Sequence, residues 1–241
     1  MNNWKKYKNI IIMVMLFFLY YIYPLLQLGY AKLMGIDFVY ENEQLILNIS
    51  DKLSIFLKLL ADLTFAIFLF IFYRKSLKGD FKKFIKNFGN ITDIAIKYWL
   101  IGLAIMASSN ILINTFTTLG TSTNQQSVNN IITTAPILAF IITTFIAPFV
   151  EEIIFRKTFK DAIKSKIPFI LTSGLFFGTI HVLSSITTSL FGLLYIIPYS
   201  ALGICLSIIY YKTDNIFSTI FIHMVHNGAL VLLYIFTTIG L

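Results

Sequence analysis

Seven apolar runs, each about as long as a membrane-crossing helix, limit what this chain can fold into. A helix needs about 20 predominantly apolar residues to cross roughly 30 Å of hydrocarbon. Hydrophobic residues make up 57% of the chain and charged residues 12%, whereas soluble domains have about 25% charged residues. We therefore expect an all-α, polytopic transmembrane helical bundle of about seven spans. The predicted spans are residues 10–30, 54–73, 94–118, 132–155, 168–188, 190–211 and 215–238.

Basic side chains are concentrated in alternate connections between these spans. Short loops that carry Lys and Arg stay on the cytoplasmic side of a membrane. The other connections are nearly neutral, as in the uncharged stretch TSTNQQSVNN. The N-terminus is therefore predicted to be cytoplasmic, and seven spans place the C-terminus outside. The basic residues precede span one or follow spans two, four and six: Lys5, Lys6, Lys8, Arg74, Lys75, Lys78, Lys82, Lys83, Lys86, Arg156, Lys157, Lys160, Lys164, Lys166 and Lys212.

The net charge of +8 is explained by this topology, so the basicity does not indicate a nucleic-acid partner. The expected partner is the lipid bilayer, and no pattern defines an oligomeric state. Cys205 is the single cysteine, which excludes an intrachain disulfide and favours a packing role. We expect a multi-pass protein of the cell membrane, and the richness in Lys, Ile and Asn is compatible with a bacterial cytoplasmic membrane.

The chain is predicted to form one membrane domain over residues 1–241, without internal repeats or a long linker. A polar stretch from Gly120 to Asn130 separates an N-terminal part, residues 1–130, from residues 131–241. All of the candidate chemistry lies in the second part.

Ionisable side chains at membrane depth are costly, so each one is a candidate for a functional site. Three predicted spans contribute such residues or their polar neighbours. They are Glu151, Glu152 and Arg156 in span four, His181 in span five, and His223, His226 and Asn227 in span seven.

Glu152 and Arg156 are four residues apart, which places them on one helix face in the favourable order for an ion pair. Glu151 lies about 100° from Glu152 around the helix. Its carboxylate is therefore not used in this ion pair and is available for another role. An alternative is that both acids only mark the cytoplasmic end of span four.

His223 and Asn227 are one helical turn apart on a common face, and His226 points to one side of it. Packing histidines are the alternative interpretation for each ring. Measured from the cytoplasmic side at about 1.5 Å per residue, Glu151 lies about 6 Å deep, His223 about 12 Å, and His181 and Asn227 about 18 Å. Side-chain lean and helix tilt would have to remove this offset for the three spans to share one pocket.

A carboxylate and an imidazole that share one water molecule can activate it for attack on a carbonyl carbon. A second histidine and an amide can stabilise the negative oxygen that results. The set therefore predicts an amide hydrolase that needs no cofactor. A zinc site built from Glu151, His181 and His223 is an alternative, but the compact H-E-x-x-H pattern is missing and no metal ligand is assigned. A serine mechanism through Ser184 or Ser185 has little support because no G-x-S-x-G turn is present.

Three motifs on separate spans resemble those of the CPBP intramembrane proteases, the group that contains CAAX prenyl endopeptidases and bacterial Abi or bacteriocin-processing proteins. They are EEIIFR at 151–156, FGTIH at 177–181 and HMVHN at 223–227. Each motif alone is weak, but the ordered trio is specific. The resemblance covers spans four to seven, and the first three spans carry no family signal.

By this resemblance Glu151 and His181 would activate water, and His223 and Asn227 would form the oxyanion site. Glu152 and Arg156 would hold the pocket together. The implied function is an intramembrane endopeptidase acting on a membrane-associated peptide or protein, either glutamate-type or metal-dependent. Short bacterial relatives look like processors of pheromones or bacteriocins, or immunity proteins. His226 lies outside the motifs and is expected to be only a neighbour of the site.

Two other functions stay open at this point. A non-enzymatic bacteriocin-immunity or membrane scaffold protein would use its basic face, and a proton-coupled transporter would use the intramembrane acids and histidines. Away from the motifs, Lys58 and Asp62 are expected to neutralise each other in span two. The segment KKFIKNF at 82–88 is predicted to be a short basic amphipathic surface segment.

Overall fold

The computed structural model describes residues 3–41, 44–47 and 49–239. Within these residues, seven helices are long and apolar enough to cross a membrane. Each contains most of one predicted span, so the prediction of a polytopic helical bundle is confirmed. The seven helices are Tyr7–Leu33, Asp51–Lys86, Phe88–Phe116, Pro136–Ala162, Lys166–Ile186, Leu190–Thr213 and Ile216–Thr238.

The first three spans contain one feature that the all-α prediction missed. An antiparallel hairpin of strands β1 and β2 pairs Phe38 with Leu47. Each strand is only four residues long, so neither forms an apolar run that a pattern of span length can reveal. The elements of this part are α1 (Asn3–Ile22), the 3₁₀ helix η1 (Tyr23–Leu25), α2 (Leu26–Leu33), β1 (Phe38–Glu41), β2 (Gln44–Leu47), α3 (Asp51–Lys86) and α4 (Phe88–Phe116).

The remaining spans are less regular than an apolar run suggests. The predicted polar loop at 120–130 is largely helical, because Ser122 caps a helix by accepting a hydrogen bond from the Gln125 amide. The elements are α5 (Thr123–Thr134), α6 (Pro136–Ile141), the π-helical η2 (Ile142–Ile146), α7 (Ala147–Glu151), the π-helical η3 (Glu152–Thr158), α8 (Phe159–Ala162), α9 (Lys166–Thr188), the 3₁₀ helix η4 (Leu190–Tyr195), α10 (Ile196–Thr213), α11 (Ile216–Tyr234) and the π-helical η5 (Ile235–Ile239).

The fourth membrane helix extends further than predicted. Its end was placed at residue 155 because basic residues follow, yet the helix continues to Ala162. Arg156 is fully buried and Lys157 is 6% exposed, so neither side chain lies in a loop. Glu151 is therefore about 16 Å of helix from the end at Ala162, and this added depth brings it level with the histidines.

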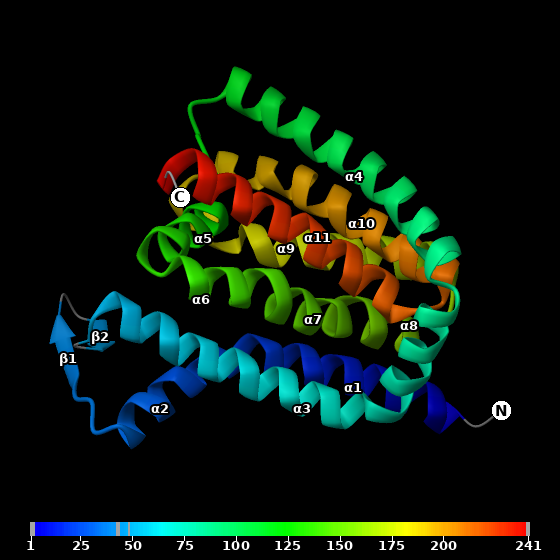
Figure 1. Cartoon of the computed structure of the whole chain (residues 1–241), viewed down its shortest axis with the longest axis horizontal. Helices are drawn as coiled ribbons and strands as arrows, with labels where there is room; N and C mark the ends of the chain where they lie inside the picture. The colour runs from blue at the N-terminus through cyan, green and yellow to red at the C-terminus, as the bar shows by residue number, and fades with distance from the viewer. Residues whose placement is uncertain (1–2, 42–43, 48, 240–241) are drawn as a thin grey trace.

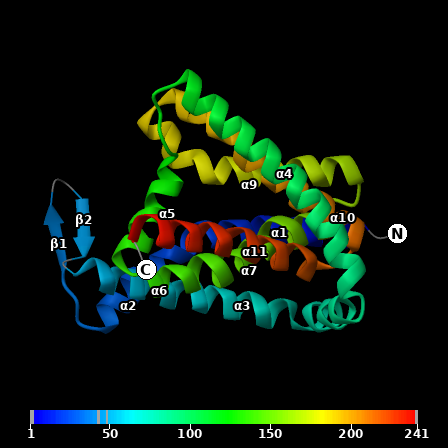
Figure 2. The same cartoon turned by 45° about the horizontal axis from the view of Figure 1, so that its top comes forward.

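The helices form two layers that diverge toward one end of the bundle. Helix α10 packs mainly against α9 and α4, while α11 contacts η2, α4 and α10. In Figure 2, α4, α9 and α10 form one layer, and α1, α3, α7 and α11 form the other. Helices α4 and α10 lie close to α11 at the end where α3 joins α4 and diverge from it toward the other end, where α5 lies between the layers.

The connections predicted to be cytoplasmic gather at the end of the bundle near α8 (Figure 1). Asn9 donates a hydrogen bond to the Asp161 carbonyl, and Asn215 donates to the Asp80 carbonyl. The segment KKFIKNF is here as well, but it continues α3 as far as Lys86 instead of forming a separate surface segment. The cytoplasmic orientation of this end stays a prediction.

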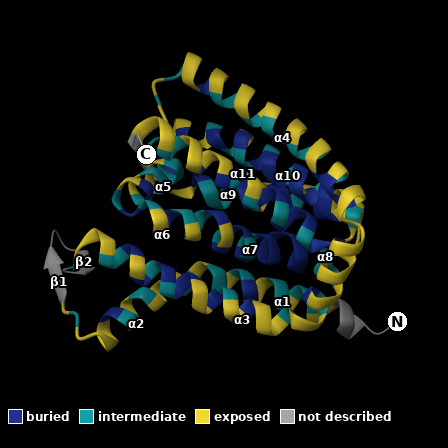
Figure 3. Ribbon diagram, in the orientation of Figure 1, coloured by how far each residue is buried: buried dark blue, intermediate teal, exposed yellow. Residues whose placement is uncertain are grey.

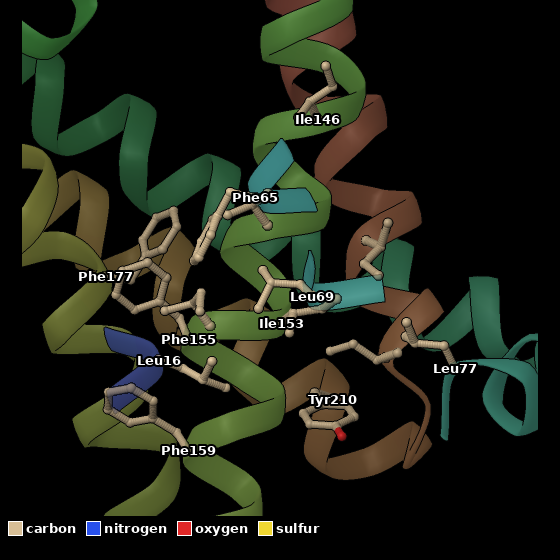
Figure 4. Packing of buried hydrophobic residues seen from close by; sticks show 14 of the residues in the cluster. Leu16, Phe65, Leu69, Leu77, Ile146, Ile153, Phe155, Phe159, Phe177 and Tyr210 are labelled. Atoms are coloured by element: carbon tan, nitrogen blue, oxygen red, sulfur yellow. The ribbon is translucent and has the colours of Figure 1, made fainter. Parts of the chain in front are cut away.

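Buried side chains are concentrated on α7, η3, α10 and the middle of α11, whereas α1, α3 and α4 expose large apolar faces (Figure 3). Phe155 and Phe177 meet edge to face, with ring centroids 5.5 Å apart, in the cluster drawn in Figure 4. The predicted pair of Lys58 and Asp62 is present at 2.8 Å. Cys205 is a buried free thiol, as expected for a packing residue.

Glycines bring the backbones of α9 and α10 into direct contact. A Cβ at Gly174 would lie 2.7 Å from the Ile204 amide nitrogen, and one at Gly178 would lie 2.8 Å from that of Ser200. Small residues four apart allow this kind of close approach between membrane helices. The contact fixes the position of α9, which carries Phe177 and His181.

We expect Gly178→Ala to lower the free energy of unfolding by about 1–3 kcal/mol, because the added methyl group overlaps the Ser200 backbone. The matched control is Gly79→Ala in α3, where nothing lies within 4 Å of the added Cβ; it should be neutral or stabilise by up to about 1 kcal/mol. Unfolding in detergent micelles, followed by circular dichroism, compares the two variants. Equal effects would contradict the proposed backbone contact.

Candidate active site

A partly open cavity of about 440 Å³ lies between the two helix layers. Residues of α4, α5, α9, α10, α11 and the fourth membrane helix line it. Five of the predicted polar residues face this one space: Glu151, His181, His223, His226 and Asn227. The structure therefore brings together groups from three separate spans, as the sequence predicted.

The carboxylate of Glu151 lies between two imidazole rings. Its Oε2 atom is 3.8 Å from Nε2 of His223 and 4.0 Å from Nε2 of His181. The Glu151 side chain is 13% exposed. These distances leave room for a small bridging group and are too long for direct hydrogen bonds.

His181 is oriented by its own helix and by two aromatic rings. Its Nδ1 atom is 2.7 Å from the Phe177 carbonyl oxygen. A carbonyl oxygen only accepts, so Nδ1 must carry a hydrogen, and in the neutral ring Nε2 is the acceptor that faces Glu151. The ring lies between Phe177 and Tyr199, with centroids 4.3 and 5.1 Å away.

Glu152 turns away from the cavity and holds two partners. Its Oε2 atom is 3.2 Å from Nε of Arg156, so the predicted pair is present, and its Oε1 atom accepts a 2.9 Å hydrogen bond from Nδ1 of His223. The Glu152 and Arg156 side chains are fully buried. The Arg156 guanidinium also lies over the Phe177 ring, 4.6 Å from its centroid. The same carboxylate therefore fixes Arg156 and His223, whose Nε2 is directed to Glu151.

Asn227 is positioned by an irregularity in the fourth membrane helix. In the π-helical segment the Ala147 amide donates to the Ile142 carbonyl, and Pro148 has no N–H to offer the Thr143 carbonyl. That carbonyl oxygen instead accepts a 2.9 Å hydrogen bond from Nδ2 of Asn227. One hydrogen of the Asn227 amide is thus used for anchoring, and the other is available to the cavity.

Sequence reasoning missed three contributors to this site. Trp99 donates from Nε1 to Nδ1 of His226 over 3.3 Å, which makes His226 a link between α11 and α4. Tyr199 stacks on His181, and the Thr143 carbonyl anchors Asn227. None of these residues is charged or part of a motif, so only the packing of the helices reveals them.

Ser185, one of the two hydroxyl residues weighed as a nucleophile, is occupied elsewhere. Its Oγ atom lies 2.8 Å from Oγ1 of Thr123, and Ser184 pairs with the same threonine at 2.7 Å. Both serines hold α5 against the end of α9.

The described part of the chain contains no group of three or more His, Cys, Asp or Glu side chains arranged to hold a metal ion. When both rings are neutral, Glu151 Oε2 and the Nε2 atoms of His181 and His223, which lie 4.0 and 3.8 Å from it, are all acceptors. These atoms can accept the two hydrogens of a water molecule. Carboxylate oxygens and imidazole nitrogens are also ligands that zinc prefers.

The fold and cavity define a polytopic membrane protein with a carboxylate and two imidazoles around one small space. Residues 133–229 match the model of the family described as Type II CAAX prenyl endopeptidase Rce1-like. The predicted resemblance is therefore confirmed over this region, which is less than half of the chain. All six predicted site residues lie within the matched region.

A relative from Bacillus subtilis (strain 168), "Putative membrane peptidase YdiL", is 30% identical over 115 residues. The similar region covers 46% of this chain and 43% of that protein, so the chain spans less than half of its relative. No solved structure matches the chain. Together, the family and the relative support a membrane protease and do not favour a non-enzymatic scaffold.

We expect Arg156→Leu and Glu152→Gln each to lower the free energy of unfolding by about 3–5 kcal/mol, because each leaves a buried charge without its partner. The double variant should lose less than the two single losses added together. Asp214→Asn is the control. It removes the charge that pairs with Lys160 and keeps a residue type that tolerates the left-handed backbone at this position. The Asp214 side chain is 78% exposed, so at most about 1 kcal/mol is expected. Denaturant unfolding in micelles measures all four variants, and additive losses would refute the coupling.

Proposed function

We propose that the protein is an intramembrane endopeptidase that hydrolyses a peptide bond in a membrane-associated peptide or protein. The observation that carries the proposal is the Glu151 carboxylate oxygen, held 3.8 and 4.0 Å from two imidazole nitrogens inside a cavity of the bundle. The match of residues 133–229 to the model of a peptidase family supports the same reaction class.

Glu151 and His181 activate the attacking water. A water molecule between them donates one hydrogen to Glu151 Oε2 and the other to Nε2 of His181, because both atoms are acceptors. Its lone pairs then face the substrate. As the water oxygen bonds to the peptide carbonyl carbon, Glu151 takes one proton, which is the role of a general base.

His223 and Asn227 stabilise the negative oxygen of the tetrahedral intermediate. His223 gives its Nδ1 hydrogen to Glu152, so it can donate from Nε2 only when the ring is protonated on both nitrogens. Asn227 contributes the amide hydrogen that Thr143 does not use. When the intermediate collapses, the C–N bond breaks and Glu151 returns its proton to the leaving nitrogen, which gives a carboxylic acid and an amine.

Glu152 and Arg156 act as positioning residues in this proposal, since neither lines the cavity. The mechanism as proposed requires no metal: His181 and His223 lie on different helices, and the compact helical pair of zinc ligands is missing from the sequence. We further propose that the protein resides in a bacterial cytoplasmic membrane, with the end near α8 facing the cytoplasm.

We expect Glu151→Gln and His181→Ala each to lower kcat by about 10²- to 10⁴-fold, the usual contribution of acid–base catalysis. Cleavage of a fluorogenic membrane peptide by the purified protein in proteoliposomes measures the effect. Asp93→Asn, an exposed acid on α4 outside the cavity, is the control and should retain wild-type turnover. Full activity of both Glu151→Gln and His181→Ala would rule out the proposal.

Exhaustive chelation is expected to leave turnover unchanged, and added zinc should not raise it. The measurement is the initial rate before chelation, after chelation and after the addition of zinc to the treated enzyme. A rate that falls on chelation and returns with zinc would show instead that Glu151, His181 and His223 hold a metal ion.

A further inference from the structure

Helix α4 directs a row of residues into the cavity on the side away from Glu151. Met106, Asn110 and Asn114 are spaced by four residues, and all three line the cavity. They belong to the membrane-crossing helix Phe88–Phe116. The row begins beyond Trp99, which contacts His226, and runs toward the wide end of the bundle, where α5 lies (Figure 2).

The two asparagine amides have no hydrogen-bond partner among the described residues. Two hydroxyl side chains nearby on α4 bond to their own helix instead: Ser109 donates to the Ile105 carbonyl and Thr115 to the Ile111 carbonyl. Asn110 is half-buried. Asn114, two residues before the end of α4, is exposed. An unpaired amide within a membrane-crossing helix is costly, so the placement of Asn110 along a cavity indicates a ligand that offers both donors and acceptors.

Their spacing matches an extended peptide. Four residues of α-helix rise about 6 Å, and alternate residues of an extended chain are about 6.6–6.8 Å apart. An Asn side chain carries one acceptor oxygen and two N–H donors. It can therefore pair with the N–H and C=O of a peptide main chain, whatever the side chains of that peptide are.

The charge of the cavity restricts the ligand further. The described lining residues include no Lys or Arg, and Glu151 is the one carboxylate among them. An acidic side chain, or a terminal carboxylate close to the cleaved bond, would be buried there beside the Glu151 carboxylate, with no Lys or Arg among the described lining residues. An uncharged internal segment avoids this cost.

We propose that Asn110 and Asn114 form a main-chain binding subsite for an extended, uncharged segment of the substrate. The inference rests on the proposed function, because the bound peptide is the one presented to Glu151. The asparagines select for extended backbone, and a lining that holds the Glu151 carboxylate but no Lys or Arg selects against acidic side chains.

The test is binding, measured separately from cleavage. The full chain carrying Glu151→Gln is placed in nanodiscs and titrated with a fluorescent twelve-residue peptide of Leu, Ala and Ser with an amidated C-terminus. Loss of one neutral hydrogen bond should weaken binding by roughly 2- to 12-fold. We expect this loss for Asn110→Leu and for Asn114→Leu. Ser108→Leu, on the exposed face of α4 and outside the cavity, should bind as the parent does.

A second experiment changes the peptide instead of the protein, so the fold of the protein is unaffected. Single amide-to-ester replacements along the peptide should weaken binding at alternate positions, and the same replacements should have no effect when the matching asparagine is Leu. A peptide with Asp at the central position should bind at least tenfold more weakly. Absence of peptide binding, or equal affinity of the asparagine variants and Ser108→Leu, would overturn the subsite. Neither result bears on Glu151, whose role is judged by turnover alone.

Discussion

The fully buried carboxylate of Glu152 is the interaction on which the rest of the site depends. A charge removed from water needs a partner of opposite sign and further hydrogen bonds, and Glu152 obtains them from Arg156 on its own helix and from His223 on α11. Because both oxygens are engaged, α11 is held against the fourth membrane helix at a fixed rotation. The same bond uses the Nδ1 hydrogen of His223, which leaves its Nε2 as the atom that reaches the cavity. One carboxylate thus sets a helix contact, a ring orientation and a tautomer.

Backbone irregularity around Glu151 does the remaining positioning. Two π-helical segments, Ile142–Ile146 and Glu152–Thr158, flank a single turn of α-helix that ends at Glu151. The first segment, with Pro148, frees the Thr143 carbonyl that anchors Asn227. The second segment begins at Glu152 and contains Arg156. Glu152 therefore pairs with Arg156, whereas the neighbouring Glu151 faces the cavity. Short π-helical insertions are frequent at functional sites, and here each has an identifiable consequence for a polar side chain.

The sequence predicted the seven spans, the pairing of Glu152 with Arg156 and the convergence of three helices, because hydropathy, helical spacing and the motifs each report on local geometry. It misplaced the end of the fourth helix because Arg156 and Lys157 looked like headgroup charges, whereas one is buried with Glu152 and the other lies over the Tyr73 ring. The depth mismatch between Glu151 and the histidines followed from that single error. The contacts of Tyr199 with His181 and of Trp99 with His226 could not be predicted, since they depend on how α10 and α4 cross their neighbours.

The two-layer arrangement also bears on how water and a peptide would reach the proposed hydrolytic site within apolar helices. Gly174 and Gly178 allow α9 and α10 to touch along their backbones, so these helices form a thin unit with little space between them. The space instead lies between the layers, where α5 is held by the hydroxyl of Tyr199, which contacts Ser122 and Asn124. The side chains at that end are polar but uncharged, so they can hydrogen-bond water or an amide without the desolvation cost of an ion. A charged entrance would bind water more strongly and would also demand a counter-charge from every substrate. Neutral amides and hydroxyls are therefore a lining that would let one opening admit both the water and the apolar peptide of the proposed reaction.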